Sequence, residues 1–499
     1  MSPELLADFA AIAPEMWLVG AILATVIADL FVGQRGRYFV GALALAGVGM
    51  ALCKLSDGAT GGSDGTAFGM LAVDGHAAFF RALILAGTGL VILHGLVFRG
   101  MEDSSRNEFI PMVLGTGLGA SLLVASDNLI MLLLSMELLS LSSYLLAGWQ
   151  RKERRSSEAA LKYLIYGAVA SAIMTFGFSL VWGLTGSMNL SEIGHRLALD
   201  VLGDNAPGFG MVMATVLVFV GLFFKASVFP FHFWAPDVYE GAPTPVTTLL
   251  AVVSKAAAFG VLVRFVDAVF LAGQEPYELL ESLGWIVAVL AAVTMTYGNI
   301  TAVLQRNVKR LLGYSSIAHA GYLLMGVAVM LVGDEATADM GRESLLFYMA
   351  TYYLATIGAF GCAMYLANRF GAEDTDDYQG LAWSAPYVCG AMVVFLVSLT
   401  GLPPTVGFVG KLYLLKASWA GGLEWLAVVA SLNAVVALYY YFKVARALFL
   451  RGEQTVVPGT PHKGLVPVIA YASLFALAGA TIWYTFSDVL IVWAEASPL

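Results

Sequence analysis

Long apolar runs follow one another along almost the whole chain and are separated by short polar segments. Each run has roughly the 20 residues that a helix needs to cross the hydrocarbon core of a bilayer, and about fourteen such runs are present. Hydrophobic residues make up 59% of the 499 residues and charged residues only 12%, which excludes an ordinary soluble protein. The pattern predicts an all-α polytopic membrane protein with about fourteen transmembrane helices.

Two of these runs are interrupted by proline. In the first, Pro230 follows Lys225 within FKASVFPFHFWAPDVYEGAPTP, and in the second, Pro403 and Pro404 lie inside SLTGLPPTVGFVGKLYLL. Proline removes a backbone donor, and the carbonyls that it frees need protein or water as partners inside a membrane. Interrupted helices at corresponding places of two halves are typical of transport pathways built from repeated units.

A weak internal similarity agrees with such a repeat. EAALKY at Glu158–Tyr163 resembles ESLLFY at Glu343–Tyr348, and each segment opens an apolar run. The two interruptions are far enough apart to be separated by a unit of about five helices. These observations indicate a repeat, but they do not show whether the second copy is inverted.

Loop lysines and arginines predict the orientation, because the cytoplasmic loops of membrane proteins carry an excess of them. When the loops are assigned alternately to the two sides of the membrane, most of these residues fall on one side, including Arg35, Arg151, Arg310, Arg451 and Lys463. Few fall on the other side. With an even number of helices, both termini are then predicted to lie on the side opposite the cytoplasm.

Four ionisable residues lie well inside the apolar runs, namely Glu137, Lys225, Lys255 and Lys411. A charge at the centre of a span costs about 2.5–3.5 kcal/mol on insertion scales, so such residues are paired, hydrated or neutralised. A lysine in an apolar site gives up its proton more readily than one in water, and a nearby carboxylate holds the proton on it. Glu137 and Lys225 are therefore candidates for a proton switch, and the row of lysines for proton transfer through water. The alternative for Glu137 is a carboxyl that only holds helices together.

Glu137 also belongs to a polar stripe. Ser140 and Tyr144 follow it by three and seven residues, so the three side chains share one face of the predicted helix. The stripe predicts a polar lining next to the switch.

Three further residues are secondary candidates for a proton relay, namely Lys162, His232 and His319. Histidine can carry protons near neutral pH, although each of these histidines could instead be hydrogen-bonded within the bundle. Lys162 follows a basic loop and could extend its ammonium to the membrane surface, as Lys443 at the end of a later span is expected to do.

Motifs for other chemistry are absent from the sequence. Cys53, Cys362 and Cys389 are far apart and form no CxxC pair, and nucleotide-binding motifs are missing. The net charge of −9 argues against nucleic-acid partners. We therefore expect no cofactor and no metal to be bound by this chain.

Two stretches carry a resemblance to a known family. Phe224–Ala257 and Leu304–Gly326, the latter reading LQRNVKRLLGYSSIAHAGYLLMG, resemble the antiporter-like membrane subunits of the proton-pumping NADH:quinone oxidoreductase, respiratory complex I. The resemblance implies that Glu137 is the glutamate of the fifth span, which pairs with the lysine of the broken seventh span, here Lys225. It also implies that Lys255 is the central lysine of the eighth span and Lys411 the terminal charged residue of the broken twelfth.

The resemblance further implies two inverted five-helix repeats, spans 4–8 and 9–13, with broken helices 7 and 12. The chain would consist of an N-terminal three-helix segment (1–105), two antiporter-like repeats (106–270 and 275–450) and a C-terminal transmembrane helix (451–499). Among the family's siblings, subunit M has a glutamate in place of Lys411. Subunit L has a long lateral helix for which the last segment leaves no room, so this chain fits neither of them.

The function implied is that of a subunit that translocates protons while NADH reduces quinone elsewhere in the complex. FMN, iron–sulfur clusters and quinone would then be bound by other subunits, and the neighbours would be subunit M, small membrane subunits and the lipid of a bacterial inner membrane. Two other functions stay open. One is a subunit of a multi-subunit cation/proton antiporter, whose large subunits share these motifs, and the other is a scaffold needed only for assembly.

Overall fold

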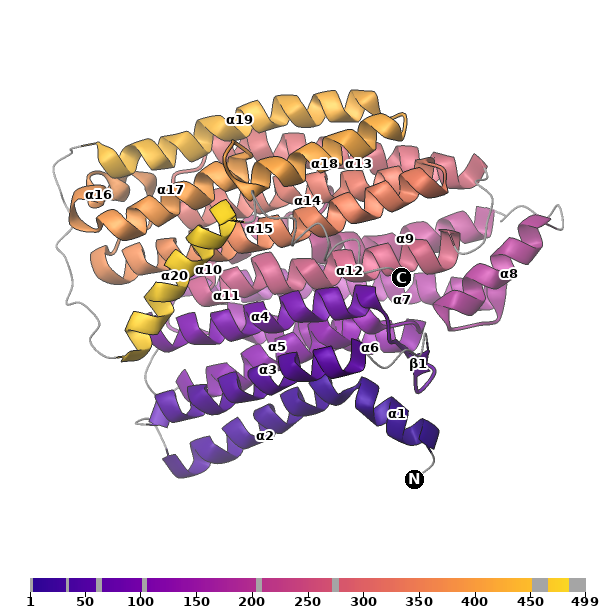
Figure 1. Cartoon of the computed structure of the whole chain (residues 1–499), viewed down its shortest axis with the longest axis horizontal. Coiled ribbons are helices and arrows are strands. Elements are labelled where there is room, and N and C mark those ends of the chain that lie inside the picture. The colour runs from indigo at the N-terminus through magenta and orange to yellow at the C-terminus, as the bar shows by residue number, and fades with distance from the viewer. Residues whose placement is uncertain are drawn as a thin grey trace.

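Helices account for nearly all of the described chain, and most of them run along a common axis (Figure 1). The computed structural model describes residues 3–32, 36–59, 65–100, 106–202, 209–271, 278–450 and 465–483. Within these residues, twelve helical segments are long and apolar enough to cross a membrane. They are α2 (Ala13–Val32), α3 (Arg37–Ala59), α4 (Gly75–Val97), α5 (Arg106–Ala125), α6 (Leu129–Ala147), α7 (Arg154–Thr185), the continuous segment Thr244–Leu271, α13 (Glu278–Val303), α14 (Val308–Val332), α15 (Glu335–Phe370), α19 (Glu424–Phe449) and α20 (Leu465–Trp483).

Two further crossings are each made of two helices in series. The first consists of α9 (Phe209–Ala226) and α10 (Trp234–Gly241), and the second of α17 (Pro386–Thr400) and α18 (Val406–Ala420). With the twelve continuous segments, the described residues therefore contain fourteen candidate crossings, which agrees with the predicted number of about fourteen. The seventh and twelfth are the broken ones, as predicted, whereas the inversion of the repeats stays a prediction.

The two breaks have the same construction. In each, the first helix ends at a residue in the left-handed region, Ser227 (φ +61°) or Gly401 (φ +82°), and a proline follows three residues later, Pro230 or Pro404. A left-handed residue ends a helix because its conformation turns the chain away from the helix axis, and proline cannot donate to the next turn. The matching breaks are what two copies of one unit would produce.

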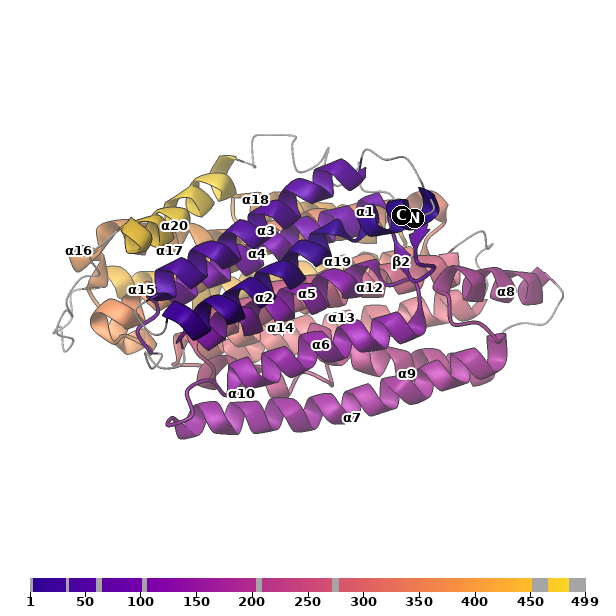
Figure 2. The same ribbon diagram turned by 90° about the horizontal axis from the view of Figure 1, so that it is seen from below.

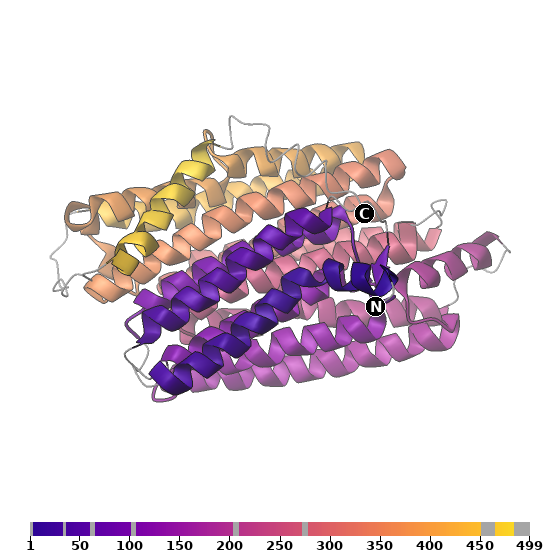
Figure 3. The same ribbon diagram turned by 60° about the horizontal axis from the view of Figure 1, so that its bottom comes forward.

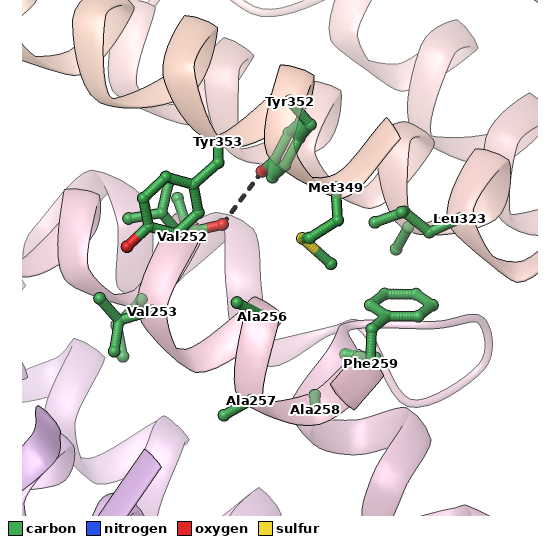
Figure 4. Close-up of a cluster of buried hydrophobic side chains, with 14 of the residues drawn as sticks. Val252, Val253, Ala256, Ala257, Ala258, Phe259, Leu323, Met349, Tyr352 and Tyr353 are labelled. Atoms are coloured by element: carbon green, nitrogen blue, oxygen red, sulfur yellow. Dashed lines mark hydrogen bonds between the residues drawn. The ribbon is translucent and has the colours of Figure 1, made fainter. Parts of the chain in front are cut away.

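The segment Thr244–Leu271 occupies the centre of the bundle, and its most apolar stretch is entirely buried. It comprises α11 (Thr244–Leu249), η3 (Leu250–Ser254), α12 (Lys255–Val266) and η4 (Asp267–Leu271), where η3 and η4 are π-helical turns. Val252 and Phe259 belong to one hydrophobic cluster with Leu323 of α14 and Met349 of α15 (Figure 4). π-helical turns inside helices are frequent at functional sites, and η3 immediately precedes Lys255.

The N-terminal helices α2, α3 and α4 pack side by side against α5, and α20 lies against α4, α15 and α17 (Figure 3). In Figure 1, α19 lies along the upper edge of the molecule and α2 along the lower edge, and Figure 2 shows α7 along another edge. Large apolar side chains are exposed on these outer helices, for example Leu30, Leu161 and Leu432. Such surfaces suit contact with lipid or with neighbouring membrane subunits.

The loops that carry the predicted cytoplasmic cations come together at one end of the bundle, which we call the basic end. The backbone N–H of Arg99 donates to Asn368 (3.1 Å), and the side chain of Gln150 donates to the carbonyl of Gly100 (2.7 Å). Loops that the sequence assigns to the same side of the membrane therefore lie at the same end of the bundle. Three of the cations counted from the sequence lie outside the described residues, namely Arg35, Arg451 and Lys463.

The remaining elements are short. The strands β1 (Thr66–Ala67) and β2 (Leu71–Ala72) form an antiparallel hairpin in which Thr66 pairs with Ala72 and Ala67 with Leu71. The others are α1 (Pro3–Ala11), α8 (Leu190–Leu202), η5 (Thr375–Tyr378) and α16 (Leu381–Ser384).

Candidate functional site

Lys225 lies in the last turn of α9, directly before the first helix break, and only 2% of its surface is exposed. Its ammonium donates to the hydroxyl of Ser140 on α6 (2.9 Å) and to that of Tyr163 on α7 (3.2 Å). The ring of Tyr163 is stacked on Trp234 of α10, with 4.3 Å between the ring centroids. The two halves of the broken span therefore meet at the partners of Lys225.

Glu137 lies one turn before Ser140 on α6 and is half-buried. Its carboxylate accepts a hydrogen bond from the hydroxyl of Ser171 on α7. No ion pair joins Glu137 to Lys225 among the described residues, and Ser140 binds the lysine instead. The structure thus brings the two charges to neighbouring turns of one polar stripe without direct contact, and their pairing stays a prediction.

Lys255 is the first residue of α12 and is 1% exposed. Its ammonium donates to the backbone carbonyl of Ser316 on α14 and to the hydroxyl of the same residue (2.6 Å). The hydroxyl of Tyr352 on α15 lies 2.8 Å from that of Ser316 and also donates to the carbonyl of Ala251 in the π-helical turn (3.1 Å), the bond drawn in Figure 4. Lys255 is therefore held among hydroxyl and carbonyl groups at the centre of the molecule.

Lys411 lies on α18, after the second break, and is 6% exposed. Its ammonium donates to the carbonyls of Leu399 (3.1 Å) and Thr400 (2.9 Å), which end α17. It also lies over the ring of Tyr322, 4.5 Å from the centroid. A cation at the carboxyl end of a helix is favoured by the partial negative charge of the unpaired carbonyls there.

His319 is buried on α14 between two tyrosines. One ring nitrogen lies 2.6 Å from the hydroxyl of Tyr348 and the other 3.2 Å from that of Tyr441. The Tyr441 hydroxyl is also hydrogen-bonded to Ser315. His319 therefore lies within a connected set of hydroxyl groups in the second half of the chain, next to the Tyr322 that contacts Lys411.

The two other secondary candidates lie apart from these groups. Lys162 is 38% exposed on α7 and binds Glu158 (2.8 Å) and Asp237 (2.5 Å). Asp237 is shared with Arg310, so Lys162 belongs to an ion cluster beside α10 rather than to the partners of Lys225. The ring of His232 is 1% exposed, lies among aromatic side chains in the break, and neither of its nitrogens has a hydrogen-bond partner within the described part of the chain.

The tyrosines around the buried charges could not be singled out from the sequence. Tyr163, Tyr348 and Tyr352 are each at most 3% exposed and supply a hydroxyl or a ring to a lysine or to His319. Two weak signals were present: the similar segments Glu158–Tyr163 and Glu343–Tyr348 each end in one of these tyrosines. In addition, Tyr348 and Tyr352 are one turn apart and both face α14.

The sequence also left unrecognised three ion pairs in which at least one partner is buried. Arg81 binds Glu15 (2.9 Å), Arg264 binds Asp74 (2.7 Å) and Arg342 binds Asp267 (2.7 Å). Arg81 and Asp267 lie near the ends of apolar runs, where solvation is the ordinary expectation, but both are buried. A pairing between helices distant in sequence leaves no local pattern.

Within the described residues, no group of three or more histidine, cysteine, aspartate or glutamate side chains could hold a metal ion.

The broken helices and the row of buried lysines define an antiporter-like polytopic membrane subunit. Residues 126–437 match the family described as NADH:quinone oxidoreductase/Mrp antiporter, TM, and the chain belongs to that family. The resemblance seen in the sequence is thereby confirmed.

Relatives with known names support the same assignment. NADH-quinone oxidoreductase subunit N of Chlorobium chlorochromatii is 40% identical, over 94% of this chain and 91% of the relative. Subunit N of Desulfovibrio desulfuricans is 39% identical, over 98% and 96% of the two chains.

Solved structures share the fold. A chain of respiratory complex I from Thermus thermophilus with bound aureothin is 31% identical with a TM-score of 0.78, covering 97% of this chain and all of the other (100%). A chain of the Mrp complex from Dietzia sp. DQ12-45-1b is 21% identical with a TM-score of 0.81, covering 99% of this chain and 97% of that one, and shows likeness of fold alone.

Proposed function

We propose that this chain is the subunit N of a proton-pumping NADH:quinone oxidoreductase and translocates protons through its buried charges. The observation that carries the proposal is a row of four buried groups, Lys225, Lys255, His319 and Lys411. Each is held by hydroxyl, ring or carbonyl groups and, among the described residues, none is ion-paired to a carboxylate. Charges that served only to join helices would be paired, as Arg81 and Glu15 are.

The first step takes place between Glu137 and Lys225. When Glu137 turns from Ser171 towards Ser140, its charge stabilises the ammonium of Lys225, and when it turns back the ammonium loses that support. The proton then passes to the next acceptor. Lys225 lies in the last turn before the break, so movement of the break changes its separation from Glu137.

The later steps pass through Lys255 and His319 towards Lys411. Hydroxyls of serine and tyrosine accept and donate protons in turn, and Ser316 and Tyr352 supply two of them beside Lys255. The two nitrogens of His319 each face a tyrosine hydroxyl, which suits a group that takes a proton on one side and gives it up on the other. Moving one proton against a potential of 100 mV costs about 2.3 kcal/mol, which a modest change in these contacts can supply.

The redox chemistry is proposed to take place in other subunits, which bind FMN, iron–sulfur clusters and quinone, while this chain has no redox centre. The basic end is assigned to the cytoplasm of a bacterium, and both termini to the periplasmic side. The proposed neighbours are subunit M and small membrane subunits, with lipid on the remaining apolar surface. The repeats 106–270 and 275–450 are proposed to be the functional units.

Copurification tests this function and separates it from the antiporter alternative. A detergent extract captured through a tag on this chain is expected to oxidise NADH with a quinone acceptor and to contain the flavin and iron–sulfur subunits. Exchange of cations for protons by a captured complex without NADH oxidation would show instead that the chain belongs to a cation/proton antiporter.

A further inference from the structure

The second half of the first broken span, α10, is too short to hold its own position. It has 8 residues, whereas α18, its counterpart after the second break, has 15. Helices as short as α10 are marginal on their own, so their position depends on contacts with their neighbours. α10 packs against α7 and α14 (Figure 2). The contacts with these two helices therefore determine where α10 lies.

Arg310 of α14 holds α10 through two carboxylates. Asp237 and Glu240 are one turn apart and lie on the same side of α10. One guanidinium nitrogen of Arg310, Nη1, lies 2.8 Å from a carboxylate oxygen of each. The three side chains are only 22–30% exposed, so water screens these ion pairs less than pairs on an open surface. The neighbouring Lys309 donates to the carbonyl of Ala242, directly after α10 (3.1 Å). The first turn of α14 therefore grips the end of α10.

Two cations of α7 bind the same carboxylates. Lys162 binds Asp237, and a guanidinium nitrogen of Arg155 lies 3.6 Å from Glu240. These contacts tie α10 to a helix of its own proposed repeat, 106–270. Arg310 ties it to a helix of the other proposed repeat, 275–450. The position of α10 is therefore set from both halves of the chain.

The other end of α10 carries Trp234, which packs against the site of Lys225. Trp234 lies one turn before Asp237 and is 1% exposed. Its ring is stacked on Tyr163, and its indole N–H donates to the carbonyl of Phe224, the residue before Lys225 (2.9 Å). The hydroxyl of Tyr163 accepts from the ammonium of Lys225 (3.2 Å). A shift of α10 therefore moves an acceptor of the first buried lysine.

We infer that Arg310 is a positioning residue for Lys225, because it holds α10 in the place where Trp234 and Tyr163 support that lysine. This inference rests on the proposed function and names a contact through which the second proposed repeat sets the geometry of the first lysine site. Among the described residues, the guanidinium of Arg310 binds the carboxylates of α10 and makes no hydrogen bond to Lys225 or Tyr163. Its effect on proton transfer therefore passes through α10.

Pumping by assembled variants tests this role. In inverted membrane vesicles with equal amounts of assembled complex, Arg310→Gln is expected to lower NADH-driven proton pumping several-fold. Arg310→Lys keeps the charge but loses the planar guanidinium, and it is expected to recover part of the rate. Arg306→Gln removes an exposed arginine four residues earlier and is the matched control, expected to pump at the wild-type rate. An assembled Arg310→Gln complex that pumps as fast as the Arg306→Gln complex would overturn the inference.

A double-mutant cycle separates positioning from a general loss of stability. If Arg310 acts by placing the hydroxyl of Tyr163, its substitution has little left to disturb once that hydroxyl is gone. Arg310→Gln combined with Tyr163→Phe is therefore expected to pump about as slowly as the slower of the two single variants. Fold-losses that multiply in the double variant would show that Arg310 does not act through Tyr163 and would overturn the inference.

Gly241 allows the same test without a change of charge, also where Arg310→Gln does not assemble. A Cβ atom at Gly241, the last residue of α10, would lie 2.5 Å from the carbonyl oxygen of Arg155 on α7. Gly241→Ala therefore pushes α10 away from α7 and is expected to lower pumping several-fold. Gly183→Ala on α7, where nothing lies within 4 Å of the added Cβ, is expected to leave pumping unchanged.

The outcomes distinguish the two proposals. Wild-type pumping by assembled Gly241→Ala or Arg310→Gln complexes, with pumping lost in Lys255→Ala, would overturn the positioning role alone. Pumping retained in an assembled Lys255→Ala complex would instead refute the proposed function.

Discussion

The ammonium of Lys411 on α18 reaches back across the second helix break and donates to the carbonyl of Thr400, the last residue of α17, over 2.9 Å. The lysine therefore bridges the two halves of one membrane span. Any movement that opens the break must remove the lysine from carbonyls that favour its charged form. The charge of Lys411 and the geometry of the break are coupled through this contact.

Gly401 in this break provides the first prediction. Its φ of +82° is costly for any other residue, by about 1–2 kcal/mol, and a Cβ atom would lie 2.7 Å from the Cδ atom of Lys411. Gly401→Ala is therefore expected to displace Lys411 and to lower NADH-driven proton pumping. Gly371→Ala is the matched control, because its φ of +69° carries the same backbone cost but nothing lies within 4 Å of the added Cβ. Equal pumping by the two variants would show that the Lys411 contact is dispensable.

Tyr163 gives the second prediction. Its hydroxyl is one of two acceptors for the buried ammonium of Lys225, and leaving a buried charged donor with one acceptor fewer costs about 1–3 kcal/mol. Tyr163→Phe keeps the ring stacked on Trp234 but is expected to slow pumping several-fold in the assembled complex. Tyr387→Phe, at a highly exposed tyrosine, is expected to pump at the wild-type rate. A Tyr163→Phe complex that pumps normally would contradict the role given to this hydroxyl.

The buried pair of Arg81 and Glu15 is predicted to act on stability rather than on pumping. Both side chains are 5% exposed, and removing one partner of a buried pair typically costs about 3–5 kcal/mol. Arg81→Leu is expected to reduce the amount of assembled complex and its thermal midpoint, and adding Glu15→Leu is expected to restore part of both, because no unpaired charge is then left. The double-mutant cycle measures the coupling. Additive losses in the double variant would exclude a coupled pair.

Two carboxyls outside the membrane spans are predicted to affect stability with opposite dependence on pH. Burial raises the pKa of Asp127, and the hydroxyl of Ser191 offsets part of that rise, while Arg264 lowers and Asp74 raises it more weakly. A folded-state pKa above the unfolded value means that stability falls as the pH rises through that interval. Asp127→Asn is therefore expected to raise the thermal midpoint at pH 7, with the gain shrinking as the pH approaches 4.

Asp74 is the counterpart of Asp127. Burial raises the pKa of its carboxyl, but the contacts with Arg264 and the backbone N–H of Ala77 outweigh burial, so that the pKa lies below its ordinary value. Its contribution to stability is present above the unfolded pKa and is lost as the pH falls. Asp74→Asn is therefore expected to lower the thermal midpoint at pH 7. The same sign of change for both variants at pH 7 would refute this account of the two carboxyls.

The helices and the two breaks could be predicted from the sequence because their causes are local. An apolar run predicts a helix over its own residues, and Pro230 and Pro404 interrupt the helices in which they lie. Lys225 and Lys411 could be recognised as candidates because a charged residue is rare and costly inside a membrane span. The partners of those lysines could not be predicted in this way. Tyr163 reaches Lys225 only through the packing of α7 against α9, and tyrosine is common in membrane helices for other reasons.

The ion pairs between helices could not be predicted from the sequence for the same reason. Arg264 and Asp74 are far apart in the sequence and each lies near the end of a span, where solvation is the ordinary expectation. The π-helical turn before Lys255 could not be predicted from the spacing of apolar residues. Every residue of that turn is buried, so its apolar residues do not mark one face of a helix.

Proton transfer through the middle of the molecule is assigned to Lys255, and a comparison of two lysine variants tests this assignment. NADH-driven proton pumping is recorded in inverted membrane vesicles that contain equal amounts of assembled complex with Lys255→Ala or with Lys443→Ala, whose lysine only reaches the carbonyl of Gln305 at the basic end (3.3 Å). Lys255→Ala is predicted to pump far more slowly than the wild type, while Lys443→Ala pumps normally. A fully assembled Lys255→Ala complex that pumps at the wild-type rate would contradict the claim.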